Sequence, residues 1–301
     1  MSANKAKKMH RSGFVNIIGN PNVGKSTLMN ALVGEKLSII TSKAQTTRHR
    51  IMGIVSGEDF QIVYSDTPGI LKPSYKLQES MMKFVTGALT DADVILYVTD
   101  TVEQSERSAE IVDSIRRSGI PTVVVINKID LSTPEALEAL VDKWQAEISG
   151  AQVVPTSAKE NFNIEGLFRT ILSLLPEGPA FYPKDTLTDK TLRFFASEII
   201  REKILKFYDK EIPYCCEIEI ESYKEEPTID RIAATIYVAR DSQKGILIGH
   251  KGEKLKRVGQ TAREDMEQFL GKKVFLQLFV KVSDDWRNNE RQLRRFGYEQ
   301  E

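Results

Sequence analysis

GNPNVGKS, residues 19–26, matches the pattern G-x-x-x-x-G-K-[ST] and lies between an apolar run, FVNII (14–18), and a helical run that begins at Lys25. Glycines let the backbone curl so that consecutive N–H groups point at an anion, and the dipole of the following helix adds to the attraction. In such a loop Lys25 contacts the β- and γ-phosphates, while Ser26 holds Mg²⁺. The stretch therefore predicts a phosphate-binding loop, in which Gly24 and Thr27 also border the ligand.

Short apolar runs and helical patterns alternate through the first 175 residues. Two runs, 51–57 and 60–66, predict an antiparallel hairpin. Three further strands are expected at 94–99, 122–127 and 152–155, separated by helices at 104–118 and 134–148. Continuous apolar strands separated by helices indicate a mostly parallel sheet with helices on both faces. We therefore expect an α/β domain over residues 13–178, preceded by a flexible arm at 1–12.

The pattern changes after PEGPAFYPKD (176–185), which contains three prolines and a glycine, and we interpret 179–190 as a linker. The expected order beyond it is a helix (192–208), strands at 217–222 and 231–239, a glycine-rich loop, a helix (253–269) and a strand (273–282). This order predicts a smaller α+β domain over 191–285. The chain has 301 residues, which agrees with two domains because one core rarely grows past about 250–300 residues.

Charge and cysteine content narrow the function classes. The chain has 42 basic and 42 acidic residues, so bulk electrostatics do not coat it with nucleic acid, and any such contact requires a local basic patch. No apolar run reaches the roughly 18 residues that a membrane span needs. The adjacent cysteines Cys215 and Cys216 fit a reducing compartment, the cytoplasm, and a strand in which one of the two faces the core.

Asp66-Thr67-Pro68-Gly69 ends the predicted strand 60–66. A carboxylate at the C-terminal tip of a strand lies where open α/β sheets bind ligands. Asp66 is therefore placed to hold the metal through water, and the Gly69 N–H to sense a γ-phosphate. Taken alone, D-T-P-G is a common turn.

Asn127-Lys128-Ile129-Asp130 follows the strand 122–127. One carboxylate accepts both the N1–H and the N2 amine of guanine, whereas adenine offers no donor at N1. We expect Asp130 to read guanine, Asn127 to brace the loop, and the Lys128 stem to lie along the base; a helix N-cap at Asp130 is the alternative. Farther along, Thr156-Ser157-Ala158-Lys159 places the Ala158 N–H near the guanine oxygen, and Ser157 and Lys159 complete that loop.

These motifs in this order resemble the translation-factor-like P-loop GTPases. Between the first two lies Gln45-Thr46-Thr47-Arg48, where the resemblance implies that one threonine completes the Mg²⁺ shell; we choose Thr47, against a plain surface turn. Ile70 stands where Ras-like enzymes have a glutamine that orients the attacking water, so slow turnover is expected. Lys25, Thr47 and Gly69 are the expected catalytic residues. In related GTPases an asparagine at the position of Asn22 helps bind K⁺; a turn-forming role is the alternative.

A second glycine-rich loop, GILIGHKG (245–252), lacks G-K-[ST] and lies between two helical segments. G-x-x-G between short helices, beside a three-stranded sheet, resembles KH domains, which clamp about four nucleotides of single-stranded nucleic acid. The expected RNA contacts are Gly245, Ile246, Ile248, Gly249, His250, Lys251, Gly252, Lys254 and Arg257, with Ile246, Leu247 and Ile248 as an apolar floor and Lys244 and Lys256 adding charge. The alternative is a tight turn that requires glycine at positive φ.

The basic tail, residues 286–301, contains Arg287, Arg291, Arg294 and Arg295 at roughly helical spacing, with Trp286 beside them. An RNA-facing helix and an ordinary solvated helix both fit this spacing.

From about Gly13 to Val282, the combination resembles the Era-like subfamily of bacterial P-loop GTPases, which carry a C-terminal type II KH domain. The resemblance implies binding of GTP and GDP with Mg²⁺, GTP hydrolysis, contact with the 3′ end of 16S rRNA, and a role in maturation of the small (30S) ribosomal subunit. It also implies a cytoplasmic protein, sometimes loosely attached to the inner membrane, and we expect a monomer. The alternatives are a P-loop ATPase or kinase, an RNA-binding module with a vestigial nucleotide domain, and a GTPase that serves another RNA.

The guanine assignment predicts that Asp130→Asn removes the preference for guanine, because the amide replaces one acceptor oxygen with a donor. Competition of unlabelled GTP and ATP against labelled GTP measures that preference in both proteins. An unchanged preference in the variant would contradict the role of Asp130.

Overall fold

The computed structural model describes residues 9–102 and 109–298. Contacts divide it into two units, each with its own sheet. The first comprises the residues up to Ser38, Thr47–Lys72 and Met82–Asp189, and the second comprises Ile39–Thr46, Pro73–Met81 and the residues from Lys190. The predicted α/β sheet followed by a smaller α+β unit is confirmed. The exact domain and linker bounds given above stay a prediction.

The first unit is built on a six-stranded sheet in the order β2-β3-β1-β4-β5-β6. The strands are β1 (Arg11–Gly19), β2 (Ile51–Ser56), β3 (Phe60–Asp66), β4 (Val94–Asp100), β5 (Thr122–Asn127) and β6 (Gln152–Pro155). All neighbours are parallel except β2 and β3, which form the predicted hairpin. Because β2 and β3 lie on one side of β1 and β4, β5 and β6 on the other, the strand order reverses at β1, and the loop after β1 lies at the crevice where such sheets bind ligands.

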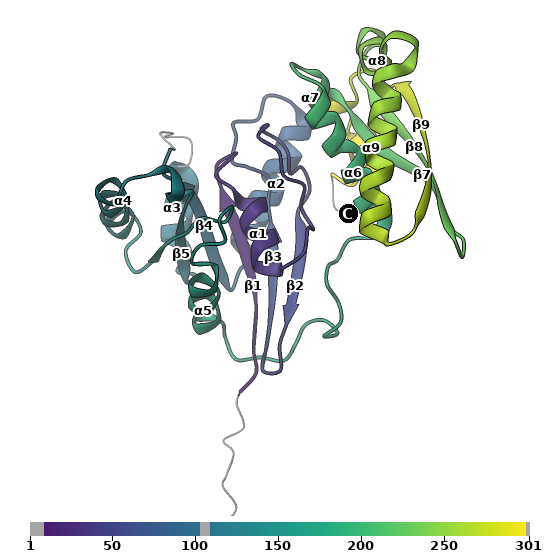
Figure 1. The fold of residues 1–301 in the computed structure, drawn as a ribbon. Coiled ribbons are helices and arrows are strands. Elements are labelled where there is room, and N and C mark those ends of the chain that lie inside the picture. The colour runs from purple at the N-terminus through teal and green to yellow at the C-terminus, as the bar shows by residue number, and fades with distance from the viewer. Residues whose placement is uncertain (1–8, 103–108, 299–301) are drawn as a thin grey trace, which may run out of the picture. The chain divides into compact units, whose positions relative to one another are not determined.

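Helices cover both faces of this sheet, because its strands are apolar on both sides (Figure 1). The helices are α1 (Lys25–Val33), α2 (Lys76–Thr90), α3 (Ala109–Ser118), α4 (Pro134–Glu147) and α5 (Ile164–Leu174). On one face, α2, α3 and α4 enclose a core that includes Ile18, Tyr97 and Trp144. On the other face, α1 and α5 lie side by side. The first residues of the predicted helix 104–118 lie outside the described residues.

The second unit contains a three-stranded sheet, β7-β8-β9, covered by helices on one face. Its elements are α6 (Leu192–Phe207), α7 (Ile212–Cys215), β7 (Glu217–Glu225), β8 (Ile229–Val238), α8 (Asp241–Ile248), α9 (Glu253–Leu270), β9 (Lys273–Val282) and α10 (Glu290–Arg295). β8 pairs antiparallel with β7 and parallel with β9, which is an edge strand. Inward residues of all three strands pack with α6 and α9 in one apolar core.

The two cysteines differ from the sequence expectation. Cys215 ends the helical turn α7, Cys216 precedes β7, and both side chains are fully buried without a disulfide. Both Sγ atoms lie near the Ile212 carbonyl oxygen, at 3.3 and 3.1 Å. The prediction of a strand with one cysteine facing the core is wrong, because a helical turn does not place neighbouring side chains on opposite faces.

The C-terminal tail packs against the second unit instead of presenting Trp286 to solvent. Trp286 is fully buried, and its Nε1 donates to the Cys215 carbonyl oxygen at 2.9 Å. Leu293 and Tyr298 are also buried. Arg295 donates to both carboxylate oxygens of Glu219. Trp286 is therefore a core residue and is unavailable to stack on a base.

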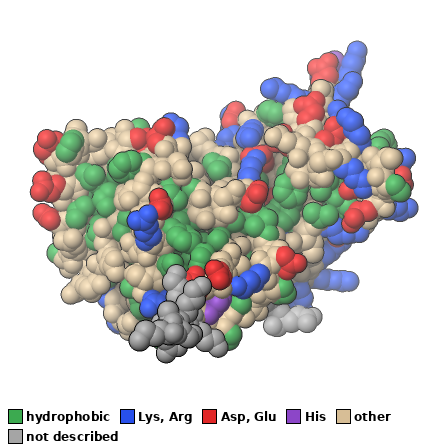
Figure 2. Space-filling view, turned by 60° about the horizontal axis from the view of Figure 1, so that its bottom comes forward, with side chains coloured by type: hydrophobic (Ala, Val, Ile, Leu, Met, Phe, Trp, Pro, Cys, Tyr) green, Lys and Arg blue, Asp and Glu red, His purple; other side chains and the backbone are tan. Residues whose placement is uncertain are grey.

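Charged side chains of both signs lie interspersed on the face shown in Figure 2, as their equal numbers suggest. Among the described residues, no helix has the length and apolar character required to cross a bilayer.

Candidate functional site

The phosphate loop joins β1 to α1 and takes its shape from two left-handed residues. Asn22 has φ 66° and Gly24 has φ 96°. A Cβ atom on Gly24 would lie 2.2 Å from Nδ2 of Asn127, so only glycine fits there. Lys25 is buried, and its Nζ donates to the Asn20 carbonyl oxygen at 2.9 Å. The loop thus keeps a cation at its centre, while Thr27 follows it, half-buried, in α1.

Three side-chain oxygens meet beside the start of α1. Ser26 Oγ donates to Asp66 Oδ2 at 2.7 Å and lies 2.8 Å from Thr47 Oγ1, which is 3.3 Å from the same carboxylate oxygen. The structure therefore brings together all three residues predicted to surround the metal.

The Asp66 carboxylate is fully buried, and its Oδ1 has no hydrogen-bond partner. Burial raises the pKa of this carboxyl, against the lowering effect of Ser26 and Lys25. A buried carboxylate oxygen without a donor needs a proton or a cation to compensate its charge, and hard oxygen ligands are those that Mg²⁺ prefers. These residues fit Mg²⁺.

The segment after Asp66 approaches the phosphate loop closely. A Cβ atom on Gly69 would lie 2.8 Å from the Pro21 backbone, so glycine is required for this approach. The next residue, Ile70, donates its N–H to the Gly19 carbonyl oxygen at 3.1 Å, and its side chain is buried among apolar neighbours such as Val85. Ile70 therefore neither reaches nor orients a water molecule.

Asn127 connects three loops through its amide. Its Nδ2 donates to the Val23 carbonyl oxygen at 2.9 Å, and its Oδ1 accepts from the Ala158 N–H at 3.0 Å and the Thr156 hydroxyl at 3.4 Å. In this structure the Ala158 N–H is thus bonded to Asn127, whereas the sequence placed it toward the guanine oxygen.

Lys128 and Asp130 border the space expected for the base. Lys128 has φ 60°, and its Nζ reaches back to the Asn22 carbonyl oxygen at 2.5 Å and to Asp100 Oδ2 at 2.6 Å. Asp130 is exposed and accepts a hydrogen bond from Ser157 at 2.6 Å. Lys159 is exposed and paired with Glu160.

Asp100 is a site residue that the sequence reasoning missed. It is a nearly buried carboxylate at the C-terminal tip of β4, where it fixes the Lys128 ammonium group. The sequence contained the signal for it, because Asp100 is the last residue of its strand, as Asp66 is of β3.

The second glycine loop lies between α8 and α9 in a sharply curved backbone. Gly249, Lys251 and Gly252 have φ of 74°, 49° and 80°, which requires glycine at two of the three positions. His250 and Lys251 are exposed. The backbone of this turn and the Lys251 ammonium group are therefore accessible to solvent. In the first loop, by contrast, Lys25 is buried.

The residues around this turn divide between surface and core. Gly245 and Ile246 are exposed and Ile248 is half-buried, but Leu247 is fully buried in the core of the second unit. The expected apolar floor of three consecutive residues is therefore wrong at Leu247, because a helix turns successive side chains by about 100°.

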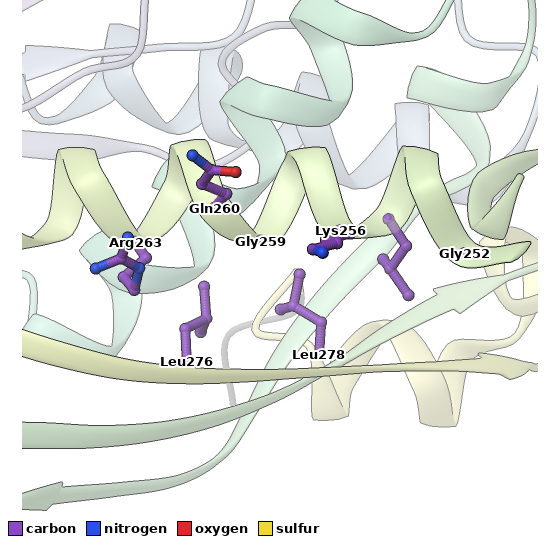
Figure 3. Close-up of a pocket in the computed structure, with 8 residues that line it drawn as sticks. Gly252, Lys256, Gly259, Gln260, Arg263, Leu276 and Leu278 are labelled. Atoms are coloured by element: carbon purple, nitrogen blue, oxygen red, sulfur yellow. The ribbon is translucent and has the colours of Figure 1, made fainter.

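A groove of about 400 Å³ runs from this turn between α9 and β9. Figure 3 shows Lys256, Gln260 and Arg263 on α9, and Leu276 and Leu278 pointing from β9 toward this helix. The remaining lining residues are Gly252, Leu255 and Gly259. A Cβ atom on Gly259 would lie 3.3 Å from Leu278 Cδ1, so this glycine lets helix and strand approach.

Two predicted RNA contacts lie elsewhere on α9. Arg257 lies over the Phe207 ring at 4.3 Å from its centroid, and Lys254 over the Tyr208 ring at 5.9 Å. Neither lines the groove, which is bordered instead by Gln260 and Arg263. The sequence signal for the face of α9 that borders the groove was Gly259, because a glycine inside a helix often marks a close approach by another element.

Comparisons with known proteins identify a family for each of the two domains. Residues 14–128 match the family described as 50S ribosome-binding GTPase, and residues 211–287 match the KH domain family. The chain is 45% identical to GTPase Era of Staphylococcus haemolyticus (strain JCSC1435) over 291 residues, which cover 96% of this chain and 97% of the relative. It is also 45% identical to GTPase Era of Alkaliphilus metalliredigens (strain QYMF), over 96% of this chain and 99% of the relative.

Two solved structures resemble the whole chain. A crystal structure of Era in complex with MgGDPNP and nucleotides 1506–1542 of 16S ribosomal RNA is 40% identical, with a TM-score of 0.92 over 97% of this chain and 100% of that chain. A structure of an Aquifex aeolicus Era variant bound to GDP·AlF₄⁻ is 40% identical, with a TM-score of 0.93 over 96% of this chain and 100% of that chain.

The raised pKa of Asp66 predicts a pH dependence. The folded, nucleotide-free protein retains a proton that the unfolded chain releases above about pH 4. Its free energy of unfolding therefore falls by about 1.4 kcal/mol for each pH unit between the ordinary and the raised pKa of this carboxyl. Asp66→Asn keeps an acceptor for Ser26 and lacks this fall. Thermal unfolding of both proteins from about pH 4 to 8 measures it.

The same variant should lose the stabilisation that Mg²⁺ adds to the nucleotide-bound protein, because the buried anion is gone. Parallel pH profiles for the two proteins, or an equal Mg²⁺ effect, would contradict this role of Asp66.

Proposed function

The chain belongs to the Era family of GTPases, and from this premise we propose that it is a nucleotide-controlled switch that binds 16S rRNA near its 3′ end and assists maturation of the small ribosomal subunit. It binds GTP and hydrolyses it to GDP and phosphate. The observation that carries the proposal is the presence of two glycine-rich loops of different construction in one chain. The loop at Lys25 is buried beside a carboxylate, and the loop at Lys251 is open and continues into a groove.

In the hydrolytic site, the residues hold the nucleotide and stabilise charge. Bound Mg²⁺ neutralises phosphate oxygens. Lys25 is positioned at the centre of the loop for the β- and γ-phosphates, Ser26 and Thr47 supply hydroxyl oxygens, and Asp66 supplies the anion. Gly69 approaches the loop closely enough for its N–H to detect the γ-phosphate. Because Ile70 is buried and apolar, turnover is slow unless another group supplies positive charge.

We propose that Asn22 assists that charge stabilisation. Its side chain is exposed at the lip of the loop, and its left-handed backbone turns its carbonyl toward Lys128. We assign the exposed amide oxygen of Asn22 to K⁺, which would stabilise the developing charge between the phosphates.

Guanine recognition rests on Asp130. This carboxylate is exposed at the tip of the loop after β5, and the Ser157 hydroxyl holds one of its oxygens. The Lys128 ammonium group is held by the Asn22 carbonyl oxygen and the Asp100 carboxylate, so its alkyl stem is fixed in position. A fixed carboxylate that faces two donors on guanine accounts for selection against adenine.

RNA recognition rests on the curved turn 249–252 and the groove beside it. Single-stranded RNA would place its phosphates at the turn, where Lys251 and the N-terminus of α9 attract them. Its bases would enter the groove, whose walls are apolar at Leu276 and polar at Gln260 and Arg263. Lys256 adds a cation within the same groove.

The division of the chain into two units supports coupling between nucleotide binding and RNA binding. Thr47 belongs to the first unit, whereas its neighbour Thr46 belongs to the second, where its carbonyl oxygen accepts a hydrogen bond from Arg201 of α6. Pro73–Met81, just beyond Gly69, also belongs to the second unit. GTP that orders Thr47 and Gly69 therefore acts on segments that continue directly into the RNA-binding unit.

We assign the protein to the cytoplasm as a monomer, with at most peripheral contact with the inner membrane. Cys215 and Cys216 are buried without a disulfide, which supports a reducing compartment.

The RNA assignment predicts that Gly252→Asp weakens binding of a labelled 16S rRNA fragment, nucleotides 1506–1542, by at least about tenfold, because an anion then faces the phosphates in a strained backbone. Nucleotide binding should be unchanged. Gly271→Asp is the matched control, since Gly271 ends the same helix at φ 63° outside the groove.

Equal affinity of wild type and Gly252→Asp for the fragment would contradict the RNA assignment. Crosslinking of both proteins to RNA in cells, followed by sequencing, should give fragments from the 3′ end of 16S rRNA for the wild type only. Enrichment of another RNA would favour a GTPase with a different RNA target.

A further inference from the structure

Helix α6 of the second unit carries an ion pair that is almost completely buried. Arg201 is 1% exposed, and Glu198, about one turn earlier in the helix, is 6% exposed. The Nε and Nη2 atoms of Arg201 donate to the two carboxylate oxygens of Glu198 at 2.7 and 2.6 Å. Neither residue belongs to the phosphate loop, to the guanine loops or to the groove.

Stability alone is a poor explanation for this pair. Burying two charges costs desolvation free energy, and apolar side chains of similar volume often stabilise a protein as well or better. The Nη1 atom of Arg201 is also buried, and it has no hydrogen-bond partner among the described residues. A buried polar network that is only partly satisfied adds to this cost. The position of the guanidinium group therefore requires another explanation.

A third contact of the guanidinium group supplies that explanation. The Nη2 atom of Arg201 also donates to the carbonyl oxygen of Thr46, the last residue of a segment that belongs to the second unit. This carbonyl group is part of the peptide bond between Thr46 and Thr47, and a peptide bond is planar. A donor fixed on its oxygen consequently restricts the backbone of Thr47.

The segment that ends at Thr46 has two further attachments inside the second unit. The Tyr75 hydroxyl donates to Gln45 Oε1 at 3.1 Å, and Gln45 has φ 56°, which is uncommon for a residue other than glycine. Lys43 pairs with Asp209 at 2.8 Å, and its carbonyl oxygen accepts from the Thr46 hydroxyl at 2.6 Å. The residues just before Thr47 are therefore held at three points.

The side chain of Thr47 lies among the residues predicted to surround the metal. Thr47 is buried, and its Oγ1 lies 2.8 Å from Ser26 Oγ and 3.3 Å from Asp66 Oδ2. The hydroxyl group of this residue thus faces the metal site, while Arg201 restricts its backbone. Groups that orient a metal ligand commonly contribute 10- to 100-fold to the affinity for the metal.

We propose that Arg201 is a positioning residue for Thr47, so that the RNA-binding unit helps to build the Mg²⁺ site of the nucleotide unit. Glu198 orients Arg201, and Arg201 fixes the peptide bond before Thr47. The effect is confined to the GTP state, because a switch segment of this kind is ordered by the γ-phosphate and its metal and released after hydrolysis. The proposal rests on the proposed function, in which Thr47 is a ligand of Mg²⁺.

The test compares the affinities of the full chain for a non-hydrolysable GTP analogue and for GDP, each with Mg²⁺. Arg201→Lys keeps a positive charge beside Glu198, but an ammonium group lacks the planar fork that bonds a carboxylate and a carbonyl group together. The variant should bind the GTP analogue about tenfold more weakly than the wild type and should bind GDP equally well. Raising the Mg²⁺ concentration should restore its rate of GTP hydrolysis, which would not repair a folding defect.

Arg193→Lys is the matched control. Arg193 is an exposed arginine of the same helix, and its Nη1 donates to the Ile220 carbonyl oxygen at 2.9 Å. This variant should bind both nucleotides as the wild type does. Thermal unfolding shows whether each variant is folded. Glu198→Gln, which loosens Arg201 without replacing it, should show a smaller loss in the same direction if Arg201→Lys does not fold.

Thr47→Val separates this proposal from the assignment of the metal site. If Thr47→Val binds the GTP analogue as tightly as the wild type, Thr47 is not a metal ligand, and that part of the proposed function fails. If Thr47→Val weakens binding of the GTP analogue alone, whereas Arg201→Lys changes neither affinity or changes both equally, only the positioning role of Arg201 is overturned.

Discussion

The nucleotide site depends on one buried amide, that of Asn127. Its donor holds the Val23 carbonyl of the phosphate loop, and its acceptor holds the Ala158 N–H of the loop after β6. The missing side chain of Gly24 leaves the space that Nδ2 occupies. A carboxylate in place of this amide would lose the donor and face the Val23 carbonyl. One side chain therefore fixes the distance between the phosphate subsite and the base subsite, so a guanine nucleotide has to satisfy both together.

The two glycine loops show how similar backbones serve different phosphates. Gly24 and Gly252 both lie just before a helix, with φ of 96° and 80°, and the N–H groups at such a helix start attract anions. The first loop is closed by buried Lys25 beside Asp66, which suits a terminal phosphate with a metal ion. The second has an exposed Lys251 and opens into a groove, which suits the diester backbone of a longer strand.

The sequence predicted most of the helices and strands, because local residue patterns control them. Helix α1 and strands β3, β5 and β9 occupy the expected residues, because glycines, β-branched runs and alternation act over a few positions. Long-range packing was not predictable in this way. The burial of Trp286 was not predicted, because its indole donates across 71 residues to Cys215. The position of Arg257 over Phe207 of α6 was likewise not predictable, because periodicity alone does not show which helix it faces; its contact with RNA stays a prediction.

The central claim is that the first loop controls the second, and the affinity for RNA in defined nucleotide states tests it most directly. The 16S rRNA fragment, nucleotides 1506–1542, is titrated into the full chain loaded with Mg²⁺ and a non-hydrolysable GTP analogue, with Mg²⁺ and GDP, or with no nucleotide. We predict binding at least about fivefold tighter in the GTP-analogue state, the effect of a coupling free energy of about 1 kcal/mol. Equal affinity in all three states would contradict the account.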